Sequence, residues 1–429
     1  MLFQSLYPLP FKVHPIPSHL LDLRPASEID TILLNPPHPS GSSSEKNIWF
    51  YWHTGYSTLP PHHRRTIHAY HRRLSPLGWT IRVVDRVLGS LLNVANFLDV
   101  SNLALFPAAF GNGTLTGTHA IQHSSDLVRW PLLLTYGGVY ADAGLMQIGD
   151  LDKLWNETIA NDSSPFQLIA YDGGDPTHRT LTNYFFASRK NNPFLTRCHK
   201  LLLKLWEGKE STEGMHAHPL LRGVPLMGQG LKLEEDGKVF TSEECATLLT
   251  DYIIQGHVMT MVMGLVDAED GWDGPKYARE RIYTLEFMVG AQLINEYTAW
   301  SGPRAYELMS LSLPKDEEEE TEHQKLAREI VENCLSRSFA FKLATGIILR
   351  FYGDTLGSLW RKNPGSDNVP GTYAHWLRYG MVYWCQDALP APVRFNNKFE
   401  PFKRGQLLGA AQALVIPSTG AVVATLEGA

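Results

Sequence analysis

Cysteine is scarce in this sequence, and its charge balance is slightly acidic. The 429 residues include four cysteines, widely spaced and without a CxxC pair: Cys198, Cys245, Cys334 and Cys385. This pattern predicts reduced, mostly buried thiols and argues against a disulfide framework or a cysteine metal site. The formal net charge is -6 at pH 7. Because a nucleic-acid binder needs a basic surface to meet phosphates, we expect no nucleic-acid partner.

Long apolar runs are also missing. The stretch from Met1 to Pro25 has prolines throughout and no apolar run of the length of a signal peptide or membrane anchor. The run VMTMVMGLV from Val258 is far shorter than the ~20 residues that cross a bilayer. We therefore expect no stable membrane insertion and a cytoplasmic location. P-loop, GxSxG and HExxH strings are absent too, so the enzyme classes built on those motifs gain no support.

Strand-like and helix-like stretches alternate near the start of the chain. Residues 47–52, NIWFYW, form an apolar run of the length of a buried strand. Residues 60–75 begin with two prolines, which suit a helix start, and their His and Arg side chains are interpreted as a solvated basic face. Residues 79–85, WTIRVVD, alternate as a strand. Such a strand-helix-strand unit indicates a parallel, doubly wound α/β sheet.

Composition divides the chain into three expected parts. Residues 1–46 are an arm that ends in linker composition, NPPHPSGSSSEKN. Residues 47–210 are expected to form the α/β core, and residues 211–429 a mainly helical addition, either packed as one unit with the core or as a lid. Helices are expected in this region at 242–255, 277–298 and 322–351. The tail from Gly405 is expected to dock on the domain or on a hydrophobic partner.

The stretch from Ser124 to Leu154 is the most informative one. Asp126 and Arg129 are three residues apart, so they share one face of a predicted helix. The glycines at 137–138 end this helix, and the strand that follows ends at Asp142. Open α/β sheets bind ligands outside such strand ends. A carboxylate placed there can hold a divalent cation, which in turn neutralises a diphosphate.

The ordered string from Ser125 to Asp142 contains SDLVR and then LLLTYGGVYAD, and it resembles the central signature of sugar transferases with a DXD motif. Within these, it is most similar to glycosyltransferase family 32 and to proteins of the capsular polysaccharide synthesis type. The resemblance implies a GT-A fold, Rossmann-like with a mostly parallel sheet, a UDP- or GDP-sugar donor, and Mn²⁺ or Mg²⁺. It makes residues 47–210 the nucleotide-sugar-binding core and residues 211–429 the acceptor-side or lid region that completes the active site. Where many relatives carry the second aspartate of the motif, this chain has Gly144.

The resemblance also implies which residues bind the donor. Trp52 and Gly55, at the end of the first strand, would meet the nucleotide base. Asp85 would lie beside the nucleotide or the donor sugar, and Tyr140 belongs to the same donor-binding set. Asn183, near the start of a later strand, would face the acceptor or the donor sugar. An ordinary core position for Trp52 stays equally open.

Three residues are predicted to act on the reacting groups. A cation at Asp142, or the guanidinium of Arg129, would stabilise the charge that develops on the leaving diphosphate. Asp126 would accept hydrogen bonds from sugar hydroxyls. Because enzymes of this fold commonly bring a C-terminal histidine back to the metal, Asp142 and His375 are the predicted metal ligands. A packed core position beside Trp376 is the alternative for His375.

These patterns predict the transfer of a sugar from a nucleotide-sugar donor to a hydroxyl acceptor, and the resemblance implies retention of the anomeric configuration. The aromatic and apolar stretches of the second half favour a small hydrophobic natural product as acceptor. Two rival hypotheses stay open. One is a non-catalytic nucleotide-sugar-binding protein on the same fold. The other is a metal-dependent hydrolase or phosphotransferase that uses Asp142, Asp150 and Asp152, although a helix-starting turn is the expected structure at residues 150–152.

Overall fold

A mixed six-stranded sheet forms the centre of the fold. The computed structural model describes residues 6–39, 44–173, 180–228, 230–268, 270–315 and 318–394, and the backbone of 402–403. In spatial order the strands are β12 (Ile282–Leu285), β6 (Leu168–Asp172), β7 (Leu181–Ser188), β4 (Gly138–Ala141), β2 (Asn47–Tyr51) and β3 (Thr80–Val84). β2 and β3 pair in parallel, whereas β6 and β7 are antiparallel. Helices flank this mostly parallel sheet, so the predicted α/β, GT-A-like fold class is confirmed.

The chain divides into two compact units, each built from separated stretches of sequence. Unit 1 comprises Met1–Leu92, Ala141–Asn161 and Leu285–Pro392. Unit 2 comprises Asn93–Tyr140, Asp162–Thr284 and Val393–Ala429. The sequence predicts domain boundaries after residues 46 and 210, each between contiguous stretches of chain. The two units are built from separated stretches and do not test these boundaries, which stay a prediction.

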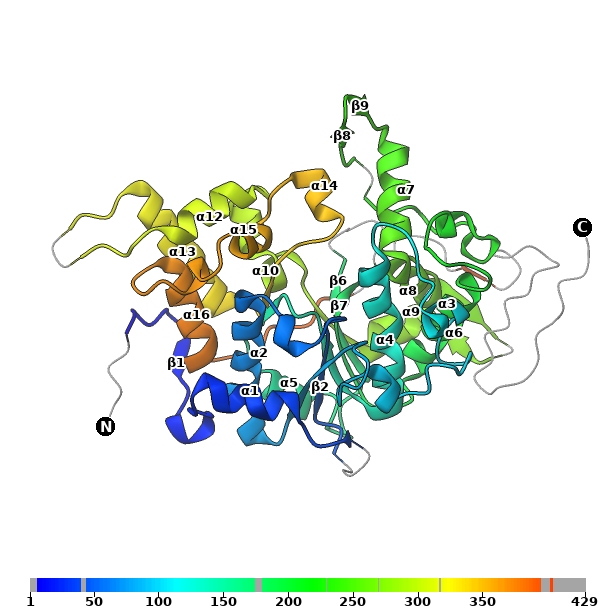
Figure 1. The fold of residues 1–429 in the computed structure, drawn as a ribbon, viewed down its shortest axis with the longest axis horizontal. Helices are drawn as coiled ribbons and strands as arrows, with labels where there is room; N and C mark the ends of the chain where they lie inside the picture. Colours follow the sequence, from blue (N-terminus) through cyan, green and yellow to red (C-terminus); the bar gives the residue numbers. More distant parts are fainter. Residues whose placement is uncertain are drawn as a thin grey trace, which may run out of the picture. The chain divides into compact units, whose positions relative to one another are not determined.

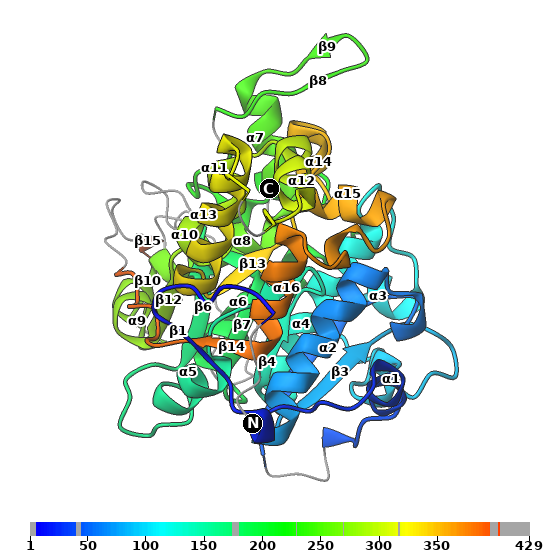
Figure 2. The same cartoon turned by 90° about the vertical axis from the view of Figure 1, so that its left-hand side faces the viewer.

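In unit 1, α2 (Pro61–Leu74) connects β2 to β3, as the sequence pattern predicts. The other α-helices described in this unit are α1 (Ala26–Leu34), α5 (Leu151–Glu157), α10 (Met288–Ala291), α11 (Leu293–Tyr297), α12 (Gly302–Ser310), α13 (Glu322–Arg337), α14 (Ile348–Tyr352), α15 (Leu356–Lys362) and α16 (Tyr373–Tyr383). Figure 2 shows α13 beside α16. Trp360 and Trp376 are fully buried in the apolar core of these helices.

Two short antiparallel ribbons complete unit 1. β1 (Val13–Pro15) pairs with β14 (Trp384–Gln386), which ties the N-terminal arm to the chain after α16. β5 (Leu145–Gln147) pairs with β13 (Ala340–Lys342). The second ribbon matters for the site, because it begins three residues after Asp142.

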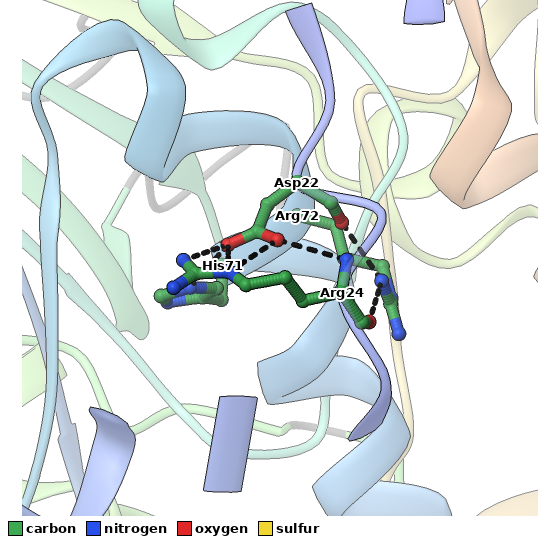
Figure 3. Close-up of polar contacts among 4 residues, drawn as sticks. All are labelled: Asp22, Arg24, His71 and Arg72. Carbon is green, nitrogen blue, oxygen red and sulfur yellow. Dashed lines mark hydrogen bonds and ion pairs between the residues drawn. The ribbon is translucent and has the colours of Figure 1, made fainter. Parts of the chain in front are cut away.

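The N-terminal arm packs on α2 through Asp22 (Figure 3). One carboxylate oxygen of Asp22 lies 3.0 Å from Nε2 of His71, and Arg24 donates further hydrogen bonds to the same carboxylate. The Arg24 guanidinium lowers the pKa of the Asp22 carboxyl well below its usual range. Arg72 donates to the backbone carbonyls of Asp22 and Arg24 at 2.7 and 2.8 Å. The arm is therefore held to the helix by charged groups from both sides.

The prediction of a solvated basic face on α2 was wrong. The helix buries most of its basic side chains, including His62, His63, His68, His71 and Arg73. Its neighbours α1 and α16 pack against it, and Arg73 donates to the backbone carbonyl of Ile148 at 2.7 Å. Basic residues read from the sequence alone look solvated, but here tertiary contacts bury them, and His68, His71 and Arg73 find hydrogen-bond partners.

In unit 2, α4 (Ala120–Tyr136) and α8 (Ile254–Gly264) pack against β7, and α6 (Pro193–Leu205) packs on both helices (Figure 1). α4 matches its predicted span and keeps Pro131 in its interior. α7 (Ser242–Tyr252) begins at a capping box formed by Thr241 and Glu244. The remaining described elements are α3 (Ala108–Asn112), α9 (Gly274–Arg281), β8 (Glu234–Glu235), β9 (Lys238–Val239), β10 (Leu265–Asp267), β11 (Trp272–Asp273) and β15 (Phe402–Lys403).

Two of the three long helices expected in the second half are interrupted by strands. The span 277–298 contains β12, and the span 322–351 contains β13 after α13 has ended at Arg337. In both cases a partner strand far away in the sequence supplies the pairing that makes the strand favourable. Helical propensity is a local property, so it cannot show that a distant strand will pair with these residues.

The other expectations on chain properties have mixed outcomes. All four cysteines are free and buried, as predicted. Within the described part of the chain, every helix is too short or too polar for a membrane span. The tail from Gly405 lies outside the described residues.

We expect Asp367 to be essential for the stability of unit 1. Its fully buried carboxylate lies 2.8 Å from the guanidinium of Arg378 on α16 and also binds Arg65 on α2. Removing one partner of a buried ion pair typically costs about 3–5 kcal/mol, so Asp367→Asn should lower the free energy of unfolding by that order in a urea titration. Burial alone would raise the pKa of Asp367, but Arg378 and Arg65 outweigh it and lower the pKa.

The pH dependence follows from the lowered pKa. A depressed carboxyl pKa contributes stability above the ordinary value of about 3.9 and loses it as the pH falls through the folded value. The wild type should therefore lose more stability than Asp367→Asn on acidification below pH 4. Asp354→Asn is the control, because its exposed pair with Lys362 should contribute under about 1 kcal/mol. Equal effects of the two substitutions would contradict the prediction.

Candidate active site

The loop after β2 rests on the end of β3 in unit 1. Gly55 has φ 84°, a backbone conformation that favours glycine, and a Cβ there would lie 3.4 Å from Oδ2 of Asp85. Trp52 donates through its indole N–H to Thr58 Oγ1 at 3.1 Å. Its ring centroid lies 5.6 Å from that of His63 on α2. The structure thus brings Gly55 against Asp85 and leaves Trp52 half-buried beside α2.

Asp85 is held rigidly at the end of β3. Its carboxylate accepts hydrogen bonds from the backbone N–H of Val87 at 2.9 Å and from the hydroxyl of Ser90 at 2.7 Å. Burial raises the pKa of Asp85, and these two hydrogen bonds oppose the rise. The loop that follows β3 therefore fixes the orientation of this carboxylate.

Asp142, directly after β4, forms an ion pair with Lys342. The Lys342 ammonium lies 2.8 Å from Oδ2 of Asp142, and the two side chains are 14% and 26% exposed. Lys342 is the last residue of β13 and stands opposite Leu145 of β5. The next residue, Leu343, donates its backbone N–H to the carbonyl of Gly144 at 2.9 Å. Backbone pairing thus delivers the ammonium to the predicted catalytic carboxylate.

Gly144, at the place of the missing second aspartate, is closely packed. A Cβ at this position would lie 3.2 Å from the carbonyl oxygen of Leu343 and 3.3 Å from Cε1 of His63. These separations are shorter than ordinary van der Waals contact. An aspartate here would have to displace Leu343 or His63, so glycine fits the observed backbone.

Cationic side chains lie near His63, the histidine that packs beside Gly144. Arg361 lies over the Trp52 ring, with its Cζ 5.9 Å from the ring centroid. Burial lowers the pKa of His63 well below its usual range, and charge on His62, Lys342 and Arg361 lowers it further. His63 is therefore neutral at physiological pH, and the net charge near it comes from lysine and arginine. Such an environment favours an anionic ligand.

The donor atoms around Asp142 do not fit a divalent cation held by protein side chains. Among the residues that the structure describes, no three His, Cys, Asp or Glu side chains come together as a metal site. Asp142 pairs with an ammonium, and the second aspartate is replaced by a packed glycine. His375 is half-buried on α16, and its Nδ1 is hydrogen-bonded to the Tyr7 hydroxyl. Ligation of Mn²⁺ or Mg²⁺ by Asp142 and His375 stays a prediction.

In unit 2, Asp126 and Arg129 are part of a buried network. Arg129 on α4 lies 2.7 Å from Oδ1 of Asp126, and the two side chains are 3% and 11% exposed. The side-chain amide of Asn183 donates to the same oxygen at 3.2 Å, and Arg129 donates to the Asn183 carbonyl. The guanidinium also lies 4.8 Å from the ring centroid of Tyr140. The structure therefore brings these four predicted residues together, while their roles in donor and acceptor binding stay predictions.

The literal DXD string at residues 150–152 starts a helix, as expected. Asp150 caps α5 by accepting a hydrogen bond from the backbone N–H of Lys153 at 2.9 Å. Asp152 lies 2.6 Å from the ammonium of Lys46 and accepts from the Trp79 indole at 2.8 Å. Both carboxylates thus have structural partners inside unit 1.

Sequence reasoning missed Lys342, His63 and Arg361. Lys342 fell inside a predicted helix, so its place at a strand end had no signal. His63 was assigned to a solvated face, although two histidines in a row on an otherwise basic helix hint at a special environment. Arg361 lies on α15, in the region for which the sequence predicts mainly helices and in which it does not single out this arginine.

Comparison with known proteins finds one matching family and several related sequences. The family model described as capsular polysaccharide synthesis protein matches residues 19–214. The O-glycosyltransferase braB of Annulohypoxylon truncatum is 33% identical over 389 residues, which cover 89% of each chain. The glycosyltransferase afumC of Aspergillus fumigatus is 34% identical over 83% of this chain and 89% of its own. The O-glycosyltransferase PaGT of Phomopsis amygdali is 28% identical over 90% and 96% of the two chains.

The matched family region contains Trp52, Gly55, Asp85, Asp126 and Asp142. The similarity to the named relatives extends over most of the chain and so covers both units. Identity above 30% across most of both chains establishes common descent with these enzymes. The chain therefore belongs to the capsular-polysaccharide-synthesis type of family and is a glycosyltransferase.

Proposed function

We propose that this glycosyltransferase takes its sugar from a nucleoside diphosphate donor and transfers it to a hydroxyl of a small hydrophobic acceptor. The observation that carries the proposal is the Asp142–Lys342 pair, which lies in the same unit as Trp52 and Asp85. An aromatic ring can stack on a nucleobase, and a fixed carboxylate can accept hydrogen bonds from ribose hydroxyls. The cationic surroundings of Asp142 suit the diphosphate.

The chemistry needs stabilisation of the leaving group. When the bond between the anomeric carbon and the diphosphate oxygen breaks, the electron pair stays on that oxygen. Fixed charges that face the oxygen lower the barrier, because they stabilise the transition state more than the ground state. Positively charged side chains close to Asp142 fill this role in the proposal.

In unit 2, Asp126 and Asn183 are proposed to bind sugar hydroxyls. The buried Arg129 holds both of them, since it pairs with the Asp126 carboxylate and donates to the Asn183 backbone. Gln255 donates to the backbone carbonyl of Asp126 at 2.7 Å, which fixes this turn of α4. A carboxylate oriented in this way can discriminate between sugars by the direction of their hydroxyls. Retention of the anomeric configuration, by attack on the face that the leaving group departs from, is part of the proposal.

An apolar acceptor is supported by the loop after Asp85. Leu88 is 98% exposed and Leu91 is 64% exposed, and both follow the predicted donor-binding carboxylate within a few residues. Val87 of the same loop approaches Gly55, where a Cβ would lie 3.4 Å from its Cγ2. Adjacent exposed leucines are unfavourable in water and are often found where an apolar ligand binds.

We also propose that the enzyme works in the cytoplasm. Its four cysteines are free and buried, which suits a compartment that keeps thiols reduced. A fluorescent fusion of the full chain should distribute through the cytosol of its host cell. Accumulation in the medium or in secretory vesicles would contradict this location.

Asp142→Asn should abolish transfer without unfolding the protein. The substitution removes the charge that holds the Lys342 ammonium, and loss of one preorganised electrostatic group typically costs about 10²–10³ in kcat. Product formation from UDP- and GDP-sugars should be measured by chromatography, with thermal unfolding as the folding check and the anomeric coupling constant of the product as the test of retention. Asp152→Asn is the matched control. Full activity of Asp142→Asn would refute the assignment.

Leu88→Asp combined with Leu91→Asp should weaken binding of the acceptor and leave binding of the donor unchanged. Burying one leucine side chain is worth about 1.5–3 kcal/mol, so KM for a small hydroxylated hydrophobic acceptor should rise about tenfold or more. Nucleotide binding should not change. Leu34→Asp is the control, because Leu34 is an exposed leucine on α1, away from the loop after Asp85 in the sequence. An unchanged KM, or transfer only onto glycans, would contradict the acceptor class.

A further inference from the structure

We propose that the ammonium group of Lys342 is the cation that balances the donor diphosphate, in place of a divalent metal ion. The inference deepens the proposed function, and it rests on that function because it concerns the same donor site. It makes Lys342 a catalytic residue, since its ammonium would touch the leaving group. Asp142 becomes the residue that positions it.

The first support is the place of Lys342. Its Nζ lies 2.8 Å from Oδ2 of Asp142, so an ammonium already contacts an oxygen of the carboxylate that would otherwise be offered to a metal ion. The β5–β13 pairing fixes the backbone from which the side chain extends. A second cation at the same carboxylate oxygen would be repelled by the ammonium, because like charges a few ångströms apart and away from bulk water interact strongly. A metal ion at this oxygen would therefore have to displace Lys342.

The second support is the packing at Gly144. The second aspartate of a DXD motif would begin from a Cβ only 3.2 Å from the Leu343 carbonyl and 3.3 Å from the His63 ring. The same segment, Lys342 followed by Leu343, thus supplies the cation and fills the room of the missing carboxylate. The ammonium at Asp142 and the tight packing at Gly144 both come from the short segment formed by the end of β13 and the residue after it.

The third support is the charge around the pair. Taken alone, Asp142 and Lys342 cancel each other. Arg361 adds a further positive charge beside the Trp52 ring, and Trp52 in turn packs on His63, which lies close to Gly144. With His63 neutral, the cations that face an incoming diphosphate are lysine and arginine side chains. Their charge does not depend on the concentration of a metal ion.

The test is calorimetric titration of the full chain with UDP and with GDP, each in EDTA and in Mn²⁺. For the wild type, the Kd of the preferred nucleotide should be the same in both conditions within about threefold. Lys342→Met should weaken binding about 10- to 100-fold in EDTA, the range expected for loss of a hydrogen bond to a charged group. Lys342→Arg keeps the charge and should retain metal-independent binding, which keeps the test decisive if Lys342→Met is unstable.

Lys46→Met is the matched control. Lys46 forms a similar partly buried pair with Asp152 in the same unit, at 2.6 Å, and its loss should leave nucleotide affinity unchanged. Wild-type binding that requires Mn²⁺, or equal binding by the wild type and Lys342→Met, would overturn the inference and leave the nucleotide donor in place. Absence of binding of either nucleotide to the wild type, in EDTA and in Mn²⁺, would instead overturn the proposed function and the inference with it.

Discussion

The antiparallel pairing of β13 with β5 is the constraint on which the candidate active site depends. It holds the chain just after Asp142 through the bond from Leu343 to the Gly144 carbonyl, and it places the Lys342 ammonium 2.8 Å from the carboxylate. The strand pairing and the bond from Leu343 are backbone contacts between segments far apart in sequence, and they fix the point from which the Lys342 side chain extends. The contact with Asp142 itself is made by the two side chains. Fixing a lysine costs both backbone and side-chain entropy. The strand already fixes the backbone of Lys342, so only its side chain has to be ordered when it pairs with Asp142.

Buried charges in turn fix the helix that supports this ribbon. Asp367 joins Arg65 of α2 to Arg378 of α16, and Arg378 also donates to the carbonyl of His62 at 3.1 Å. The adjacent residue, His63, closes the space beside Gly144. Unit 1 thus links its stability to the shape of its site, because a shift of α2 would move His63 as well as the Trp52 ring that it contacts.

Local sequence carried much of the fold and the part of the site that lies on it. Strand β2, helix α2, strand β3 and helix α4 follow from apolar periodicity, proline starts and glycine stops, and Asp142 follows from its place after a strand. What could not be predicted depends on distant partners. Lys342 looked helical until β5 paired with it, and the histidines of α2 looked solvated until the arm and α16 covered them. The only hint of Lys342 in the sequence was indirect: Gly144 replaces the second aspartate, so another group has to supply the function of that aspartate.

Gly144 and Lys342 make sense as a matched pair. With glycine at 144, the backbone can approach Leu343 closely enough for β13 to pair, and that pairing brings in a fixed positive charge. Placing a carboxylate at 144 would push against Leu343 and His63, and in the proposed site it would add negative charge beside the donor diphosphate unless a metal came with it. Losing the lysine alone would leave Asp142 to repel the same diphosphate. In the proposed site, a glycine at 144 and a cation at 342 therefore meet one electrostatic requirement, although the two residues are distant in sequence.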